Sequence, residues 1–307
     1  QAAVFLIALR MKRETDGENC GILSGIQDLT HTATAAVDEV VDIADPYNGY
    51  NRTLPAAPFL APLLAELGTP AVTQGLETVR PKYGFTHRQM LRAAGVNVDL
   101  SVEAAATQLG DRSKGWAYID QKYSCPMLHE LIPLRNELIK RSVITTAEVL
   151  TRPIRGRQQT HLMTGYVHKP YAPIYAMLAR HGGFDSALLV RGVEGGVTAS
   201  LRQASTTYQF IGEQPEVAVE VDPESLGIQH DLRAPAIPVG VEGNEEISKR
   251  AAEAGIKALE GREGITFDTL LLSATLVLHH LGRCETLEQG AELVRDVLKS
   301  GGAAGRI

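Results

Sequence analysis

Segments typical of β-strands alternate with segments typical of helices along this chain, and this alternation restricts the possible folds more than any other feature. Strand-like runs occur at residues 37–44, 71–74, 116–120, 143–146, 160–167, 187–191 and 217–221. Strands separated by helices are typical of βαβ units, in which the strands run parallel within one sheet. The sequence therefore predicts an α/β fold with a mainly parallel sheet flanked by helices.

The helical segments show apolar side chains at three- and four-residue spacing. We expect helices at residues 2–11, 17–29, 59–67, 88–94, 102–109, 127–140, 172–181, 244–259, 267–281 and 287–298. The first of these has apolar groups on nearly every face, which predicts a buried helix. Thr53 is a suitable cap for the helix that ends at Gly68.

The apolar N-terminal stretch and the cysteines indicate in which cellular compartment the chain resides. The apolar stretch at residues 2–9 is too short to span a bilayer, and basic residues follow it rather than precede it, as a signal peptide would require. We therefore expect a cytoplasmic protein with no membrane role, and a further segment before Gln1, which lies within a predicted helix. Cys20, Cys125 and Cys284 are scattered, which favours structural thiols in a reducing compartment over a catalytic cysteine.

The charge is unevenly distributed along the chain. The protein has a formal net charge of −6, yet residues 112–202 contain 13 basic and 6 acidic residues. A basic segment within an acidic protein predicts an anionic partner, either a phosphorylated small molecule or a nucleic acid. Pairing of this segment with the acidic parts of the same fold explains the pattern equally well.

Four segments resemble the anthranilate phosphoribosyltransferases and their relatives in glycosyltransferase family 3. They are FLIALRMK at residues 5–12, PLRNEL with RS at 133–142, FDSALLVRG at 184–192, and TLEQGA through SGGA at 286–303. Each match is loose, but their order and spacing extend over nearly the whole chain.

The resemblance implies a small all-α domain beside an α/β domain, in the phosphoribosyltransferase (nucleoside-phosphorylase-like) architecture. The helical domain would comprise residues 1–36 plus about 124–142, and the α/β domain residues 37–123 plus 143–307. It further implies an active site in the cleft between the domains and a homodimer formed through the helical domain.

The family's first motif is a glycine-rich GTGGD loop that binds 5-phosphoribosyl diphosphate after the first strand. Glycines let backbone N–H groups approach phosphates closely. This chain has DPYNG at residues 45–49, where one glycine remains and Asp45 would repel a diphosphate. The side chains of this loop could still hold a sugar or phosphate, so we predict ligand contacts at Tyr47, Asn48, Gly49, Asn51 and Arg52.

The family's second motif, KHGNR, corresponds to TQGLE at residues 73–77, which keeps only Gly75. Arg80, Lys82 and Tyr83 follow closely and could compensate for the missing cations. We therefore predict ligand contacts at Gly75, Lys82 and Tyr83, although a plain surface loop explains this segment equally well.

The family's third motif, HGxDGLDE, holds magnesium through an adjacent Asp-Glu pair, because this cation prefers carboxylate oxygens. Here the segment is RGVEGGVT at residues 191–198, so Val197 and Thr198 replace the pair and only Glu194 remains at the first acidic position. We predict no metal site and no certain cofactor, with magnesium bound only if phosphoribosyl diphosphate is bound.

Arg135 falls on the arginine that contacts the anthranilate carboxylate in the family, so the resemblance implies a carboxylate or phosphate ligand there. A dense basic set surrounds the following segment and could instead contact nucleic acid; it consists of Lys140, Arg141, Arg152, Arg155 and Arg157. A solvated basic loop is the alternative.

These observations leave three functional hypotheses. The first is a divergent phosphoribosyltransferase-like protein that binds a phosphorylated or carboxylated ligand in the cleft and does not catalyse anthranilate transfer. The second is a non-enzymatic nucleic-acid (DNA) binding protein on the same fold, whose phosphate contacts would be salt-dependent. The third is a structural or regulatory dimer with a vestigial cleft.

Overall fold

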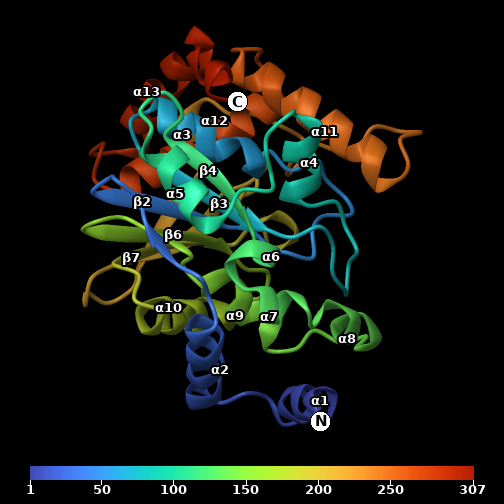
Figure 1. Ribbon diagram of the computed structural model, residues 1–307. Helices are drawn as coiled ribbons and strands as arrows, with labels where there is room; N and C mark the ends of the chain where they lie inside the picture. Colours follow the sequence, from blue (N-terminus) through green and yellow to red (C-terminus); the bar gives the residue numbers. More distant parts are fainter.

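A seven-stranded sheet forms the centre of the computed structural model, which describes residues 1–307 (Figure 1). Its spatial order is β4-β3-β2-β6-β7-β8-β9; the first five strands are mutually parallel, β8 pairs antiparallel with β7, and β9 pairs antiparallel with β8. The strands are β2 (Glu39–Ala44), β3 (Ala71–Gly75), β4 (Trp116–Asp120), β6 (Gln159–Gly165), β7 (Ser186–Val190), β8 (Ser205–Ile211) and β9 (Val217–Val221). The predicted α/β fold with a mainly parallel sheet is confirmed.

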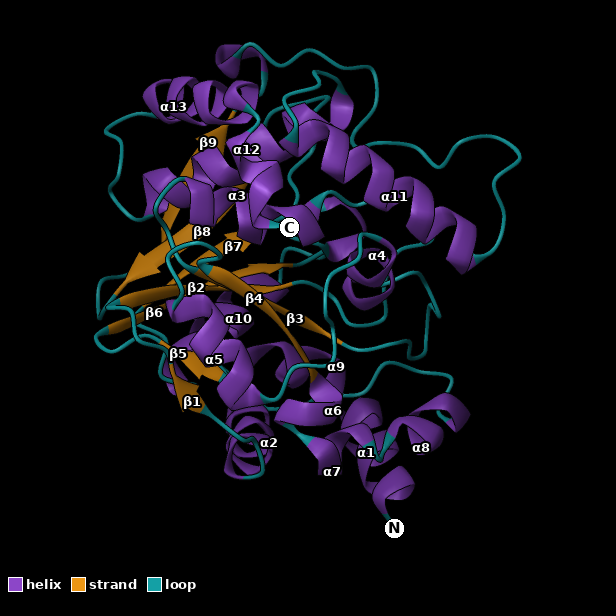
Figure 2. Cartoon of the chain, turned by 45° about the horizontal axis from the view of Figure 1, so that its top comes forward, coloured by secondary structure: helices purple, strands orange, loops and turns teal.

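Alternate residues of the strands face opposite sides of the sheet, as the two-residue period of a strand requires. Val41 and Ile43 of β2 face the largest apolar cluster, which they share with helices of the C-terminal third. This layer contains α3 (Leu60–Glu66), α11 (Asn244–Leu259), α12 (Ile265–His280) and α13 (Leu287–Ser300), which lie together on one side of the strands in Figure 2.

The opposite face of the sheet is covered in two parts. Over β3 and β4 it packs against α5 (Val102–Gly110). Over β6 and β7 it packs against α10 (Tyr171–His181), and the same apolar cluster includes Leu6 and Leu23 from the first two helices. Helices far apart in the sequence therefore share one core with the sheet.

Short helices gather at the end of the molecule that carries the N-terminus (Figure 1). They are α1 (Ala2–Lys12), α2 (Asp16–Asp28), α6 (Gln121–Ser124), α7 (Pro126–His129), α8 (Ile132–Glu137) and α9 (Ile144–Ala147). Elsewhere lie α4 (His87–Ala93) and the two-stranded sheet of β1 (Ala33–Thr34) and β5 (Ile154–Arg155). The division of the chain at the residues given above stays a prediction.

Two predicted elements differ from the structure, and one strand of the main sheet was not predicted. The expected helix at 127–140 is divided into α7 and α8, because Pro133 has no N–H to donate and its ring excludes the carbonyl one turn earlier. The expected strand at 143–146 is the helix α9, whose Ile144 is buried in the cluster shared with α2. Strand β8 was not expected at all.

Two local predictions were also wrong. Helix α1 is not buried all round, since only Leu6 and Leu9 are buried and Phe5 is 53% exposed. Thr53 caps no helix, because the chain stays non-helical until η1 (Ala57–Phe59) and Thr53 bonds to Glu194 instead. None of the helices combines the length and the apolarity that a bilayer crossing requires.

Candidate functional site

A cleft of about 750 Å³ opens at the carboxyl ends of β2 and β6. It reaches Ala44 at the end of β2 and Gly165 at the end of β6. The chain turns outward in opposite directions from these neighbouring strands, since β3 lies on one side and β7 on the other. Ligands of open α/β sheets bind at such a switch point, and the volume suits a small organic molecule. This cleft is therefore the candidate functional site.

The rim of the cleft is positively charged. Arg10 and Arg13 come from the end of α1, and Lys140 and Arg141 come from the segment after α8. None of these four side chains forms an ion pair within the chain. Four unpaired cations around one concave surface outnumber its two acidic side chains, Glu14 and Glu194, and therefore favour an anionic ligand.

The turn after β2 presents one unsatisfied polar group to the cleft. Asn48 is only 2% exposed, lines the cleft, and its Oδ1 atom has no hydrogen-bond partner. A buried carbonyl oxygen without a donor is costly, so it is suited to a donor from a ligand such as a hydroxyl group. Asn48 thus lines the candidate site, and its contact with a ligand stays a prediction.

Asp45 does not face the cleft, contrary to the expectation that its charge would repel a diphosphate there. The carboxylate is 2% exposed and accepts hydrogen bonds from the hydroxyl of Tyr50 at 2.6 Å and the backbone N–H of Val197 at 2.8 Å. The Nε2 atom of His87 lies 2.8 Å from its Oδ2. Groups of the protein itself therefore stabilise the charge of the Asp45 carboxylate. Through these contacts the carboxylate connects the turn after β2 to α4 and to the loop after β7.

That loop approaches the turn so closely that side chains do not fit. A Cβ atom added to Gly196 would lie 1.7 Å from the hydroxyl of Tyr50, and one added to Gly192 would lie 1.6 Å from the carbonyl oxygen of Gly196. The glycines of this segment therefore serve packing rather than phosphate binding.

Asn51 and Arg52 are hydrogen-bonded to Glu194 through their backbone, and neither residue lines the cleft. Their backbone N–H groups donate to the Glu194 carboxylate at 3.1 and 2.9 Å, and both side chains are exposed. Lys82 lies beside them, with its Nζ donating to the carbonyl oxygens of Gly49 and Glu194. Burial lowers the pKa of Lys82, and the neighbouring Glu194 carboxylate opposes that change.

Other predicted contacts lie outside the cleft. The Tyr47 hydroxyl donates to Gln74 Oε1 at 2.6 Å, and burial raises its pKa well above the ordinary value. Gly75 is buried at the end of β3. Tyr83 is 39% exposed, and its hydroxyl accepts a hydrogen bond from Arg80. The structure does not bring these three residues to the lining of the cleft.

Arg135 is placed inside the protein. It is 4% exposed and makes a bidentate pair with Glu148, with both N–H···O distances at 2.7 Å. Gln121 donates to the same carboxylate at 3.0 Å. The guanidinium that the resemblance assigns to a ligand is thus already paired, and it does not line the cleft.

The predicted basic set is split between opposite ends of the strands. Lys140 and Arg141 lie at the cleft, whereas Arg155 and Arg157 flank the start of β6 at its other end. Arg152 stacks over the ring of Phe184, and burial lowers its pKa. The set therefore forms no continuous surface of the kind that a nucleic-acid backbone requires.

The residues present do not fit a magnesium ion. Val197 and Thr198 are buried where the family has its acidic pair, and Asp45 and Glu194 have their carboxylates occupied by protein donors. No group of three potential ligands among histidine, cysteine, aspartate and glutamate occurs in the structure. Magnesium requires octahedral oxygen ligands, and this site has no free carboxylate to supply them.

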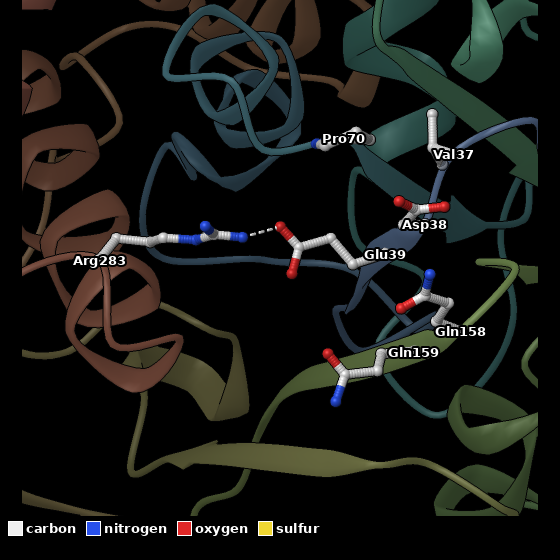
Figure 3. Close-up of a pocket in the computed structure, with 7 residues that line it drawn as sticks. All are labelled: Val37, Asp38, Glu39, Pro70, Gln158, Gln159 and Arg283. Atoms are coloured by element: carbon white, nitrogen blue, oxygen red, sulfur yellow. Dashed lines mark hydrogen bonds and ion pairs between the residues drawn. The ribbon is translucent and has the colours of Figure 1, made fainter.

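A second hollow of about 350 Å³ lies at the amino ends of the strands, opposite the cleft (Figure 3). Its cation, Arg283, points across it to the carboxylate of Glu39. His161 and His280 lie behind it, bridged by the hydroxyl of Ser186. Since its arginine is already paired, this hollow offers less to an anion than the cleft does.

Sequence reasoning missed several residues of the cleft. Arg10, Arg13, Tyr171 and Tyr175 line it; Arg10 lies in the segment at residues 5–12 that carries the resemblance, and the other three lie in no motif. The run RMKR at the end of α1 was a signal for the two arginines, because it places three cations within four consecutive residues. Nothing local marked the tyrosines, which reach the cleft from α10 through the fold.

Comparison with known proteins adds three findings. The family model described as "Glycosyl transferase family, a/b domain" matches residues 50–304. An uncharacterized protein of Aquifex aeolicus is 28% identical over 94% of this chain and 84% of its own length. The anthranilate phosphoribosyltransferase of Thermomicrobium roseum is 27% identical over 100% of this chain and 85% of its own.

Solved structures share the fold. The anthranilate phosphoribosyltransferase of Thermus thermophilus superimposes with a TM-score of 0.73 at 22% identity, covering 98% of this chain and 86% of that one. The Saccharomyces cerevisiae enzyme in complex with PRPP and Mg gives 0.75 at 15% identity, covering 98% and 81%.

Proposed function

The chain belongs to the glycosyl transferase family as an anthranilate-phosphoribosyltransferase-like member, and on that premise we propose that its cleft binds a small phosphorylated or carboxylated molecule without magnesium. The observation that carries this proposal is the set of four unpaired cations around the switch-point cleft, with the unsatisfied Asn48 carbonyl inside it. An anion together with a hydroxyl group matches both features, as in a sugar phosphate. The protein is a divergent member that does not transfer anthranilate at an ordinary enzymatic rate.

The absence of the family's magnesium-binding Asp-Glu pair supports this divergence. Family structures include one in complex with PRPP and Mg, whereas Val197 and Thr198 supply no carboxylate here. If a glycosyl group is transferred, the reaction would rest on positioning and on fixed positive charge near the anion, rather than on a metal bridge. Arg141 and Arg10 are the residues that we assign to the anion.

Replacing Arg141 with alanine tests the assignment. We expect the affinity for ribose 5-phosphate, measured by isothermal titration calorimetry without magnesium, to fall about 10- to 100-fold, because a charge-assisted contact contributes about 1.5–3 kcal/mol. Arg262→Ala removes an exposed arginine beyond α11 and should change the affinity less than twofold. Equal losses in both variants, or binding of short DNA alone, would contradict the proposal.

We also propose that the protein forms a homodimer through α1. Apolar side chains are unusually exposed at this end of the molecule: Val4 is 73%, Phe5 53% and Met11 78% exposed, and Met127 of α7 is 60% exposed. Exposed apolar side chains that lie together mark interaction surfaces, and a second copy of the chain would cover these ones.

Phe5→Asp tests this interface. Burying a carboxylate against an apolar partner is costly, so we expect the variant to be monomeric in size-exclusion chromatography with light scattering. Leu293→Asp places the same charge on α13, at the far end of the molecule, and should leave the dimer intact. A wild-type monomer at tens of micromolar would exclude the interface.

A further inference from the structure

Three consecutive backbone N–H groups converge on one carboxylate beside the cleft. Arg52 and Thr53 donate to Oε1 of Glu194 at 2.9 and 3.0 Å, and Asn51 donates to Oε2 at 3.1 Å. The hydroxyl of Thr53 adds a fourth donor at 3.0 Å. Successive N–H groups that point to one centre form an anion-binding nest of the kind that holds phosphates. We call the N–H groups of residues 51–53 the Glu194 nest.

A cation completes this nest. Lys82 Nζ lies 3.9 Å from Oε2 of Glu194, and the two side chains are only 16% and 10% exposed. Coulomb attraction is stronger at such partly buried positions than in water. The nest with Lys82 therefore has the donors and the charge of a phosphate site, while the anion inside it belongs to the chain itself.

Glu194 reaches the nest at a conformational cost. Its backbone has φ 54°, an unusual value for a residue other than glycine, and it lies about 140 residues further along the chain than the groups it contacts. Glu194 and Gly195 also line the cleft. The nest therefore borders the cleft, and the Glu194 side chain separates the two.

We propose that the Glu194 nest is a second anion site adjoining the cleft, and that Glu194 determines specificity by filling it. A ligand with one phosphate can occupy the cationic rim while Glu194 stays in place. A diphosphate must displace the carboxylate from four donors and an ammonium group, or lie against its negative charge. The site thus selects monophosphates over diphosphates. This inference rests on the proposed function, which places the first phosphate at the cationic rim of the cleft.

The test compares two anions on three proteins. Wild type, Glu194→Gln and the charge-matched control Glu213→Gln are titrated calorimetrically with pyrophosphate and with ribose 5-phosphate, in buffer without divalent cations. Glu213 is exposed in the turn between β8 and β9 and does not line the cleft. We expect Glu194→Gln to bind pyrophosphate at least tenfold more tightly than wild type, and Glu213→Gln to change that affinity less than threefold.

The outcomes separate the two proposals. An unchanged pyrophosphate affinity in Glu194→Gln, or an equal gain in both variants, overturns the nest as a second anion site. Failure of wild type to bind ribose 5-phosphate overturns the proposed function, whereas a gain in pyrophosphate affinity still supports the nest. If Glu194→Gln does not fold, Glu194→Gly repeats the comparison with a residue that adopts φ 54° freely.

Discussion

Replacing Arg135 with alanine is expected to lower the free energy of unfolding by about 3–5 kcal/mol, which is the usual effect of leaving one partner of a buried ion pair alone. Glu148 is 1% exposed and would keep a charge without its bidentate partner. Since small proteins are commonly stable by about 5–15 kcal/mol, this loss would be a large share of the total. Urea denaturation followed by circular dichroism measures it.

A paired variant distinguishes stability from ligand binding at this position. Arg135→Met together with Glu148→Leu removes both charges, so most of the lost stability should return. If Arg135→Ala instead keeps its stability and loses affinity for ribose 5-phosphate, then Arg135 contacts the ligand, as the family resemblance implies, and the internal pair is secondary.

Replacing Asp45 with alanine is expected to cost a similar amount, about 3–5 kcal/mol, because it removes the acceptor of two buried donors and the carboxylate beside His87. The hydroxyl of Tyr50 and the N–H of Val197 would lose their acceptor, and the His87 ring would lose a carboxylate oxygen 2.8 Å away. Asp38→Ala, at an exposed aspartate just before β2, should change stability by less than about 0.5 kcal/mol. Denaturation midpoints of the two variants within experimental error of each other would refute the network.

The sheet could be predicted from the sequence because its strands have a strong local signal. Val40, Val41 and Ile43 in β2 combine β-branched side chains with a following turn, and this pattern needs no knowledge of neighbours. The run Val143-Ile144-Thr145-Thr146 has the same composition and forms a helix, because burial against α2 outweighs local preference. Pro133 was a visible signal that the prediction at 127–140 did not use.

The candidate site was harder to predict than the fold. Asn48 was predicted as a ligand contact, and Lys140 and Arg141 were predicted as nucleic-acid contacts; all three line the cleft. The partners of Arg135 and Asp45 could not be predicted, because Glu148 and His87 are joined to them only by tertiary packing. The resemblance located the third motif at Glu194, but only the fold places its carboxylate against residues 51–53.

The apolar cluster that joins α1 and α2 to β6 and β7 has a consequence for motion at the cleft. Leu6, Leu23, Leu162 and Leu189 belong to one packed core. Packed interiors resist gradual deformation, so the two walls of the cleft cannot swing apart as independent bodies without breaking that core. Any opening must therefore come from the segments at the rim, such as residues 138–142 and 192–196. The width of the cleft is then a fixed property of the folded chain, and ligands are admitted by rearranging loops rather than by hinge motion.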